Sequence, residues 1–147
     1  MAKKSKKDFE FKPFESTTRT AKHLRITNNM LESAAWKKLS CHAMVIYMYM
    51  KSKYNFNNEN DISLTYAEGQ KLMHKNTFTK AIDELIEYGF IKVIRQSWTS
   101  RECNIYGFSS MWQKYGTPEF KIDPRRKRDS TATKNKKARL KIAHQVG

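Results

Sequence analysis

The stretch from Asn76 to Ile91 constrains the fold of this chain more strongly than any other. Its apolar residues recur at spacings of three and four, the period of an α-helix with one buried face. They are Phe78, Ala81, Ile82, Leu85 and Ile86. Gly89 and Phe90 then match a helix ending in which a left-handed glycine precedes an apolar residue. We therefore expect a helix over Asn76–Tyr88 that packs one face on a core and turns sharply at Gly89.

The residues before this helix predict a shorter helix and a tight turn. Thr65 and Glu68 have the spacing of a capping box, in which each side chain bonds the backbone of the other residue. This pair would open a helix over Tyr66–Met73, and His74–Lys75 would form the break before the next helix. We also expect a very short strand at Ile62–Leu64, where apolar and polar residues alternate.

Two helices are expected further upstream. Asn28 or Asn29 would cap one that runs to about Lys38, with Leu31, Ala34 and Ala35 facing inward. Ser40 would cap the second, which runs from Cys41 to about Tyr54 and is apolar nearly all round. A helix of that kind must be covered on two sides. The second cover is either an arm containing Phe9, Phe11 and Phe14 or another subunit, and we expect a homodimer.

The residues after Gly89 predict a β-hairpin and a final helix. Phe90–Arg95 and Asn104–Phe108 are rich in β-branched and aromatic residues, and a polar stretch separates them. Ser109 or Ser110 would cap a last helix over Met111–Tyr115, ended by Gly116. Together these elements predict a single α+β domain over residues 27–120, mostly helical with a small antiparallel sheet.

The charge of the chain is concentrated at its two ends. The 147 residues carry a formal net charge of +15, of which residues 1–26 hold +5 and residues 117–147 hold +7. The ends also lack apolar periodicity, so residues 1–26 and 121–147 are expected to be flexible basic arms. Such arms are suited to polyanions, although basic tails without a special role are common in lysine-rich chains.

The order of helices and hairpin resembles the winged helix-turn-helix. The helix closing on Gly89-Phe90-Ile91 carries this resemblance, and residues 39–120 look like winged-helix proteins of phages and conjugative plasmids of low-G+C Gram-positive bacteria. Further shared features are Ala35–Ser40, Tyr54-Asn55, Ile105-Tyr106, Trp112 and Tyr115–Phe120. The turn at His74 lacks the glycine that many members have there.

The resemblance makes Asn76–Tyr88 the recognition helix, and its residue types fit that role. Its exposed N-terminal end would be basic and polar, and Asp83, Glu84 and Glu87 would form an acidic outward face at the other end. Recognition helices present their N-terminal residues to base edges, and the positive end of the helix dipole favours phosphate. The residues expected to contact DNA are Lys75, Asn76, Thr77, Thr79 and Lys80. Asparagine can bond adenine, threonine can touch thymine methyls, and lysine can reach guanine or phosphate.

The hairpin and the arms would add further DNA contacts. The expected wing residues are Arg95, Gln96, Ser97, Trp98, Thr99 and Arg101. Arginine on a hairpin tip suits a narrow minor groove, whereas Trp98 would lie either on the DNA backbone or folded back on the sheet. The expected contacts to the DNA backbone are Lys71, Arg125, Arg126, Lys127 and Arg128.

Several classes of protein are not indicated. Cys41 and Cys103 form neither a disulfide framework nor a metal motif, and no glycine-rich phosphate loop is present. We expect no catalytic residues, metal, cofactor or small-molecule ligand, and Tyr47 and Tyr49 are expected in a core or an interface. No apolar run is long enough to span a membrane and no signal peptide is recognised, so a cytoplasmic protein is expected.

The leading hypothesis is a sequence-specific double-stranded DNA-binding protein of a mobile element. It would be a non-catalytic accessory factor at an origin, a transfer site or a partition site. A transcriptional repressor of the same fold would need the same groove contacts, so the sequence leaves both open. Two further alternatives are a non-specific nucleic-acid binder that uses only the arms and a protein–protein module, which the charge disfavours.

Overall fold

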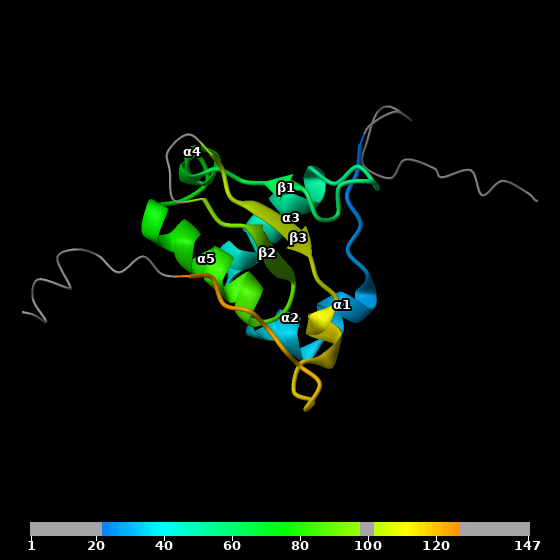
Figure 1. The fold of residues 1–147 in the computed structure, drawn as a ribbon. Coiled ribbons are helices and arrows are strands. Elements are labelled where there is room, and N and C mark those ends of the chain that lie inside the picture. Colours follow the sequence, from blue (N-terminus) through cyan, green and yellow to red (C-terminus); the bar gives the residue numbers. More distant parts are fainter. Residues whose placement is uncertain (1–21, 98–101, 127–147) are drawn as a thin grey trace, which may run out of the picture.

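The computed structural model describes residues 22–97 and 102–126, and these form one α+β domain (Figure 1). Five α-helices, one 3-10 helix and three strands lie in these two ranges. In chain order they are α1 (Asn28–Glu32), α2 (Ala34–Lys38), α3 (Cys41–Ser52), β1 (Ile62–Ser63), α4 (Tyr66–Gln70), α5 (Lys75–Glu87), β2 (Ile91–Arg95), β3 (Ile105–Phe108) and η1 (Met111–Lys114).

The first predicted helix is in fact two short helices. Ser33 adopts an extended backbone conformation, ends α1, and caps α2 through its hydroxyl, which accepts a hydrogen bond from the Trp36 N–H at 3.2 Å. Thr27, rather than an asparagine, caps α1. Because of the break, the predicted inward set was wrong in part. Leu31 and Ala34 are exposed, and the buried residues are Met30, Ala35 and Trp36.

Helix α3 begins as predicted and buries one face. The Ser40 hydroxyl accepts from the Ala43 N–H at 3.2 Å, as expected of an N-cap. The buried residues are Ala43, Ile46, Tyr47 and Met50. On the other side Met48 and Tyr49 are 37% and 47% exposed, so the described residues do not cover this face fully.

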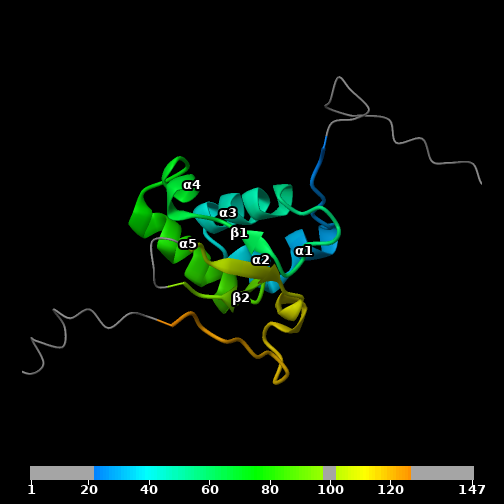
Figure 2. The ribbon, with the colours of Figure 1, turned by 45° about the horizontal axis from the view of Figure 1, so that its top comes forward.

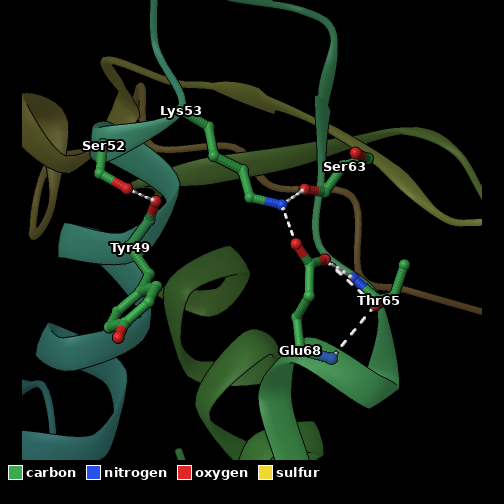
Figure 3. A network of polar contacts seen from close by, with 6 residues as sticks. All are labelled: Tyr49, Ser52, Lys53, Ser63, Thr65 and Glu68. Atoms are coloured by element: carbon green, nitrogen blue, oxygen red, sulfur yellow. Dashed lines mark hydrogen bonds and ion pairs between the residues drawn. The ribbon is translucent and has the colours of Figure 1, made fainter. Parts of the chain in front are cut away.

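A polar network joins the end of α3 to β1 and α4 (Figure 3). The Lys53 ammonium donates to the Ser63 carbonyl and the Glu68 carboxylate, both at 2.6 Å. The predicted capping box is confirmed, since the Thr65 hydroxyl accepts from the Glu68 N–H and the Glu68 carboxylate accepts from the Thr65 N–H. These bonds fix where α4 begins relative to α3.

Helix α4 ends at Gln70, earlier than predicted, because its last turn closes on one carbonyl. The Gly69 carbonyl accepts from the N–H groups of both Leu72 and Met73, and the chain then turns into α5. Gly69 also allows a close helix–helix approach. A Cβ at this position would lie 2.4 Å from the Phe78 ring.

Helix α5 buries the predicted stripe and has the predicted ending. Its five apolar residues are all 3% exposed or less. Gly89 has φ +79°, and the N–H groups of Phe90 and Gly89 donate to the carbonyls of Leu85 and Ile86. These two bonds are those of a Schellman motif, so the helix turns directly into β2.

The sheet has the order β1-β3-β2 with antiparallel pairs, which confirms the predicted hairpin. Val93 pairs with Tyr106 and Arg95 with Ile105, so Ile94 is an extra residue in β2 and forms a β-bulge. The predicted last helix is the short η1, which ends before Gly116. Figure 2 shows α3 on one side of the sheet and residues 121–126 on the other.

We predict different costs for alanine at Gly89 and Gly116, which are both left-handed. Gly89→Ala should lower the free energy of unfolding by at least about 2 kcal/mol, since a Cβ there would lie 2.8 Å from the Met111 Cβ and the Trp112 nitrogen. Gly116→Ala should cost only about 1 kcal/mol, because it has a similar φ but open space around it. Urea unfolding of both variants measures the difference, and equal losses would contradict the close contact at Gly89.

We also predict a pH-dependent contribution from Glu68. The hydrogen bonds from Lys53 and Thr65 hold the pKa of its carboxyl below the ordinary value, so its stabilisation is present above that value and lost as the pH falls through the lowered one. Glu68→Gln should cost about 1 kcal/mol or less at pH 7, because the pair is partly exposed, and less at pH 3 than at pH 7. Urea unfolding at both pH values tests this, with Glu59→Gln as the exposed control. A cost that is the same at both pH values would show that the charge of Glu68 does not stabilise the folded domain.

Candidate nucleic-acid interface

The N-terminal half of α5 presents an exposed polar surface. Lys75, Asn76 and Lys80 are exposed, whereas Thr77 and Thr79 are half-buried. The Thr79 hydroxyl donates to the Lys75 carbonyl at 3.0 Å and therefore bonds its own helix. The structure thus brings the five predicted residues together at one helix end, and three of them are exposed.

The turn before α5 shapes this end without a glycine. The His74 ring accepts from the Asn76 N–H through Nδ1 at 3.3 Å and so caps the helix. The Lys75 ammonium lies over the Tyr66 ring at 5.6 Å from its centroid, which links α4 to the start of α5. Lys71 is exposed on the same turn. A basic corner, which we define as Lys71, Lys75, Asn76 and Lys80, therefore adjoins the positive end of the α5 dipole.

The acidic end of α5 differs from the expectation. Glu84 does not face solvent as a free carboxylate, because it accepts from the Ser40 N–H at 3.0 Å and from its hydroxyl at 2.8 Å. It therefore supplies a second cap to α3. Asp83 pairs with Arg125, and only Glu87 of the three carboxylates is exposed. Asp83 and Glu84 thus each form contacts with another part of the domain.

Residues 121–126 lie along α5 rather than apart from the domain, and we call them the C-terminal strap (Figure 1). Arg125 anchors the strap. Its Nε donates to one carboxylate oxygen of Asp83 at 3.1 Å, its Nη2 forms an ion pair with the same oxygen at 3.0 Å, and Nη1 lies 3.5 Å from the Tyr66 hydroxyl. Burial, the largest single influence, would lower the pKa of Arg125, but the charge of Asp83 together with Tyr106 and Tyr66 outweighs it and raises the pKa.

The strap also binds the start of the loop between β2 and β3. The Gln96 amide donates to the Arg126 carbonyl at 2.6 Å and accepts from the Arg126 N–H at 3.0 Å. This reciprocal pair resembles one rung of a β-ladder. The strap therefore connects α5 with the hairpin, and no sequence pattern signals that connection.

These contacts change the roles available to three predicted residues. The Arg125 side chain is only 10% exposed, so it cannot reach a DNA phosphate while it stays paired with Asp83. The Gln96 amide is occupied by the strap, and the Ser97 N–H donates to the Asn104 side chain at 2.8 Å. Arg95 and Arg126 are exposed. Trp98, Thr99, Arg101, Lys127 and Arg128 lie outside the described residues.

Within residues 22–97 and 102–126, no three His, Cys, Asp or Glu side chains are grouped so that they could hold a metal ion. Over the same ranges, no helix combines the length and the apolar character needed to cross a bilayer. Tyr47 is a core residue, as predicted, and burial raises the pKa of its hydroxyl.

We predict that Asp83→Asn releases the strap. Loss of the carboxylate charge leaves the partly buried Arg125 without a counter-ion, so hydrogen exchange of the Arg126 amide should quicken by about fivefold or more, equivalent to about 1 kcal/mol. Glu87→Gln, an exposed change on the same helix, is the matched control. Equal exchange in the two variants would mean that Asp83 does not hold the strap.

Comparison of the chain with protein-family models, with curated proteins and with solved structures finds no match.

Proposed function

We propose that this protein is a winged helix-turn-helix protein that binds double-stranded DNA in a sequence-specific manner. The order of elements supports the proposal: α4 and α5 are joined by a tight turn, and the β2–β3 hairpin follows directly. The basic corner is the observation that carries it. A helix start that is cationic, exposed and free of carboxylates matches what a recognition helix presents to the major groove.

The proposed docking inserts the start of α5 into the major groove. Asn76 would read a base edge, Lys80 would reach a guanine or a phosphate, and Lys71 and Lys75 would contact the backbone. Thr77 and Thr79 are half-buried, so they would contact thymine methyls only where the wall of the major groove lies close to the helix. Because Asp83 and Glu84 are bonded within the domain, little negative charge remains to oppose this approach.

The hairpin and the chain ends would add contacts to the DNA backbone. Arg95 is exposed at the end of β2, and the hairpin points toward the same side of the domain as the start of α5 (Figures 1 and 2). The strap ends at Arg126, beside Gln96, and the sequence continues with Lys127 and Arg128. The basic ends would strengthen binding to any duplex through counterion release, without selecting a sequence.

The biological role is assigned from the resemblance to phage and plasmid proteins. We propose a cytoplasmic, non-catalytic accessory factor of a mobile element that acts at an origin, a transfer site or a partition site. The partly exposed Met48 and Tyr49 on α3 support a homodimer, which would read two half-sites. A DNA footprint across the element separates this role from repression, because a repressor would protect promoters only.

The proposal predicts a defined DNA target and specific losses. In-vitro selection from a random duplex pool should yield a consensus site. On that site Asn76→Ala and Lys80→Ala should each weaken binding by about 1–3 kcal/mol more than on an unrelated duplex. Gel-shift titration of both duplexes measures the difference.

A matched control is Lys37→Ala, which removes an exposed lysine from α2, near the opposite end of α5 (Figure 1). This variant should weaken both duplexes slightly and equally, since it removes only charge. If selection yields no consensus, or if residues 27–126 alone show no preference for any duplex, the arms alone bind and the proposal fails.

A further inference from the structure

A second basic surface lies far from α5. The chain at Lys22–Arg25, the end of α3 and the loop that follows α3 enclose an open groove of about 510 Å³. Among the residues that line it are Lys22, Leu24, Arg25, Lys51, Tyr54 and Phe56. In both ribbon views this end of the domain lies opposite the start of α5 (Figures 1 and 2). The groove and the basic corner are therefore separate surfaces.

Phe56 is held in the groove in an unusual conformation. Its backbone has φ +73°, a left-handed value that is rare for a bulky residue, and its side chain is 77% exposed. The turn that holds it is built by asparagines: the Asn58 side chain accepts from the Asn55 N–H at 2.8 Å and donates to the Lys53 carbonyl at 2.9 Å. The loop thus presents an aromatic ring to solvent instead of burying it.

The Phe56 ring is part of an aromatic surface. Its centroid lies 5.3 Å from that of Tyr54, and the Lys51 ammonium lies 5.7 Å from the Tyr54 ring. Backbone strain that exposes a ring is costly, and such outliers concentrate at functional sites. A planar, apolar ligand group would recover part of that cost by stacking on Phe56.

The groove also carries positive charge that no described carboxylate neutralises. Lys22 and Arg25 are exposed, and no Asp or Glu is among the described residues that line the groove. Lys51 is held over three aromatic rings, the nearest being Phe108 at 4.8 Å, and within the described ranges it has no carboxylate partner. Partial burial lowers the pKa of Lys51, and the opposite charge of a bound anion would favour its protonated form.

We propose that this groove binds single-stranded nucleic acid. Exposed rings beside unpaired cations are the combination that such strands select, because bases stack on the rings and phosphates contact the cations. In this binding mode a base stacks on Phe56, and the adjoining phosphates contact Lys22, Arg25 and Lys51. An acidic peptide would use the cations but not the flat ring, and an apolar helix would leave the cations without partners. The inference stands apart from duplex binding by α5.

The test uses the full chain and two probes, a fluorescent 12-mer of deoxythymidine and one of uridine, which distinguish DNA from RNA. Phe56→Asn removes the ring, and asparagine tolerates the left-handed backbone, so the fold is retained. Affinity should fall by about fivefold or more for at least one probe. The dependence of affinity on salt should keep its slope, since no charge is lost.

Controls separate the groove from the basic ends and from α5. Leu31→Gln removes a partly exposed apolar side chain from α1, outside the groove, and should leave both affinities unchanged. A 12-mer that contains 4-thiothymidine should cross-link on irradiation to the peptide that includes Tyr54 and Phe56.

Three outcomes would overturn the proposal. The first is an unchanged affinity of Phe56→Asn for both probes. The second is cross-linking only to the chain ends or to α5. The third is a change in the oligomeric state of Phe56→Asn with no loss of oligonucleotide affinity, which would make the groove a contact between copies of the chain. Because duplex binding is measured separately, its failure would not produce any of these results.

Discussion

The rotation of α5 about its own axis is the constraint on which the other features depend. Five buried side chains on one face hold the helix against α3 and the sheet. Burial of each of the larger ones contributes roughly 1.5–3 kcal/mol to the free energy of folding. Glu84 adds a directional contact, because its carboxylate caps α3 through Ser40. With this face fixed inward, Asn76 and Lys80 must face outward. The packing of α5 in the core therefore positions the surface proposed to read DNA, and Asn76 and Lys80 need no further contacts to face outward.

Contacts within the domain also determine which carboxylates of α4 and α5 remain at the surface. The chain is strongly basic, yet the described carboxylates of α5 and α4 are largely engaged: Asp83 with Arg125, Glu84 with Ser40, and Glu68 with Lys53. Each of these contacts joins elements that are distant in sequence. These three carboxylates thus connect elements within the domain, whereas Glu87 of α5 stays exposed. The first turns of α5 carry lysines and no carboxylate.

Much of the fold could be predicted from the sequence, and the failures have physical reasons. The capping box at Thr65, the stripe of α5 and the glycine ending at Gly89 are local patterns, and the structure confirms them. The break at Ser33 was missed because a serine can sit inside a helix as well as cap one. The pairing of Gln96 with Arg126 spans thirty residues and has no local signature. Likewise, the exposure of Phe56 depends on a backbone angle, which composition does not reveal.

The extra residue at Ile94 restricts where related chains can change in length. A bulge bends its strand and increases the local twist, so the outer half of the hairpin is turned relative to the inner half. Loss of that one residue would restore regular alternation and reverse the sides on which Arg95 and Gln96 project. Length changes beyond Gln96 would leave this geometry untouched. Insertions and deletions should therefore accumulate in the hairpin tip of related chains, while the spacing from Ile91 to Gln96 stays constant.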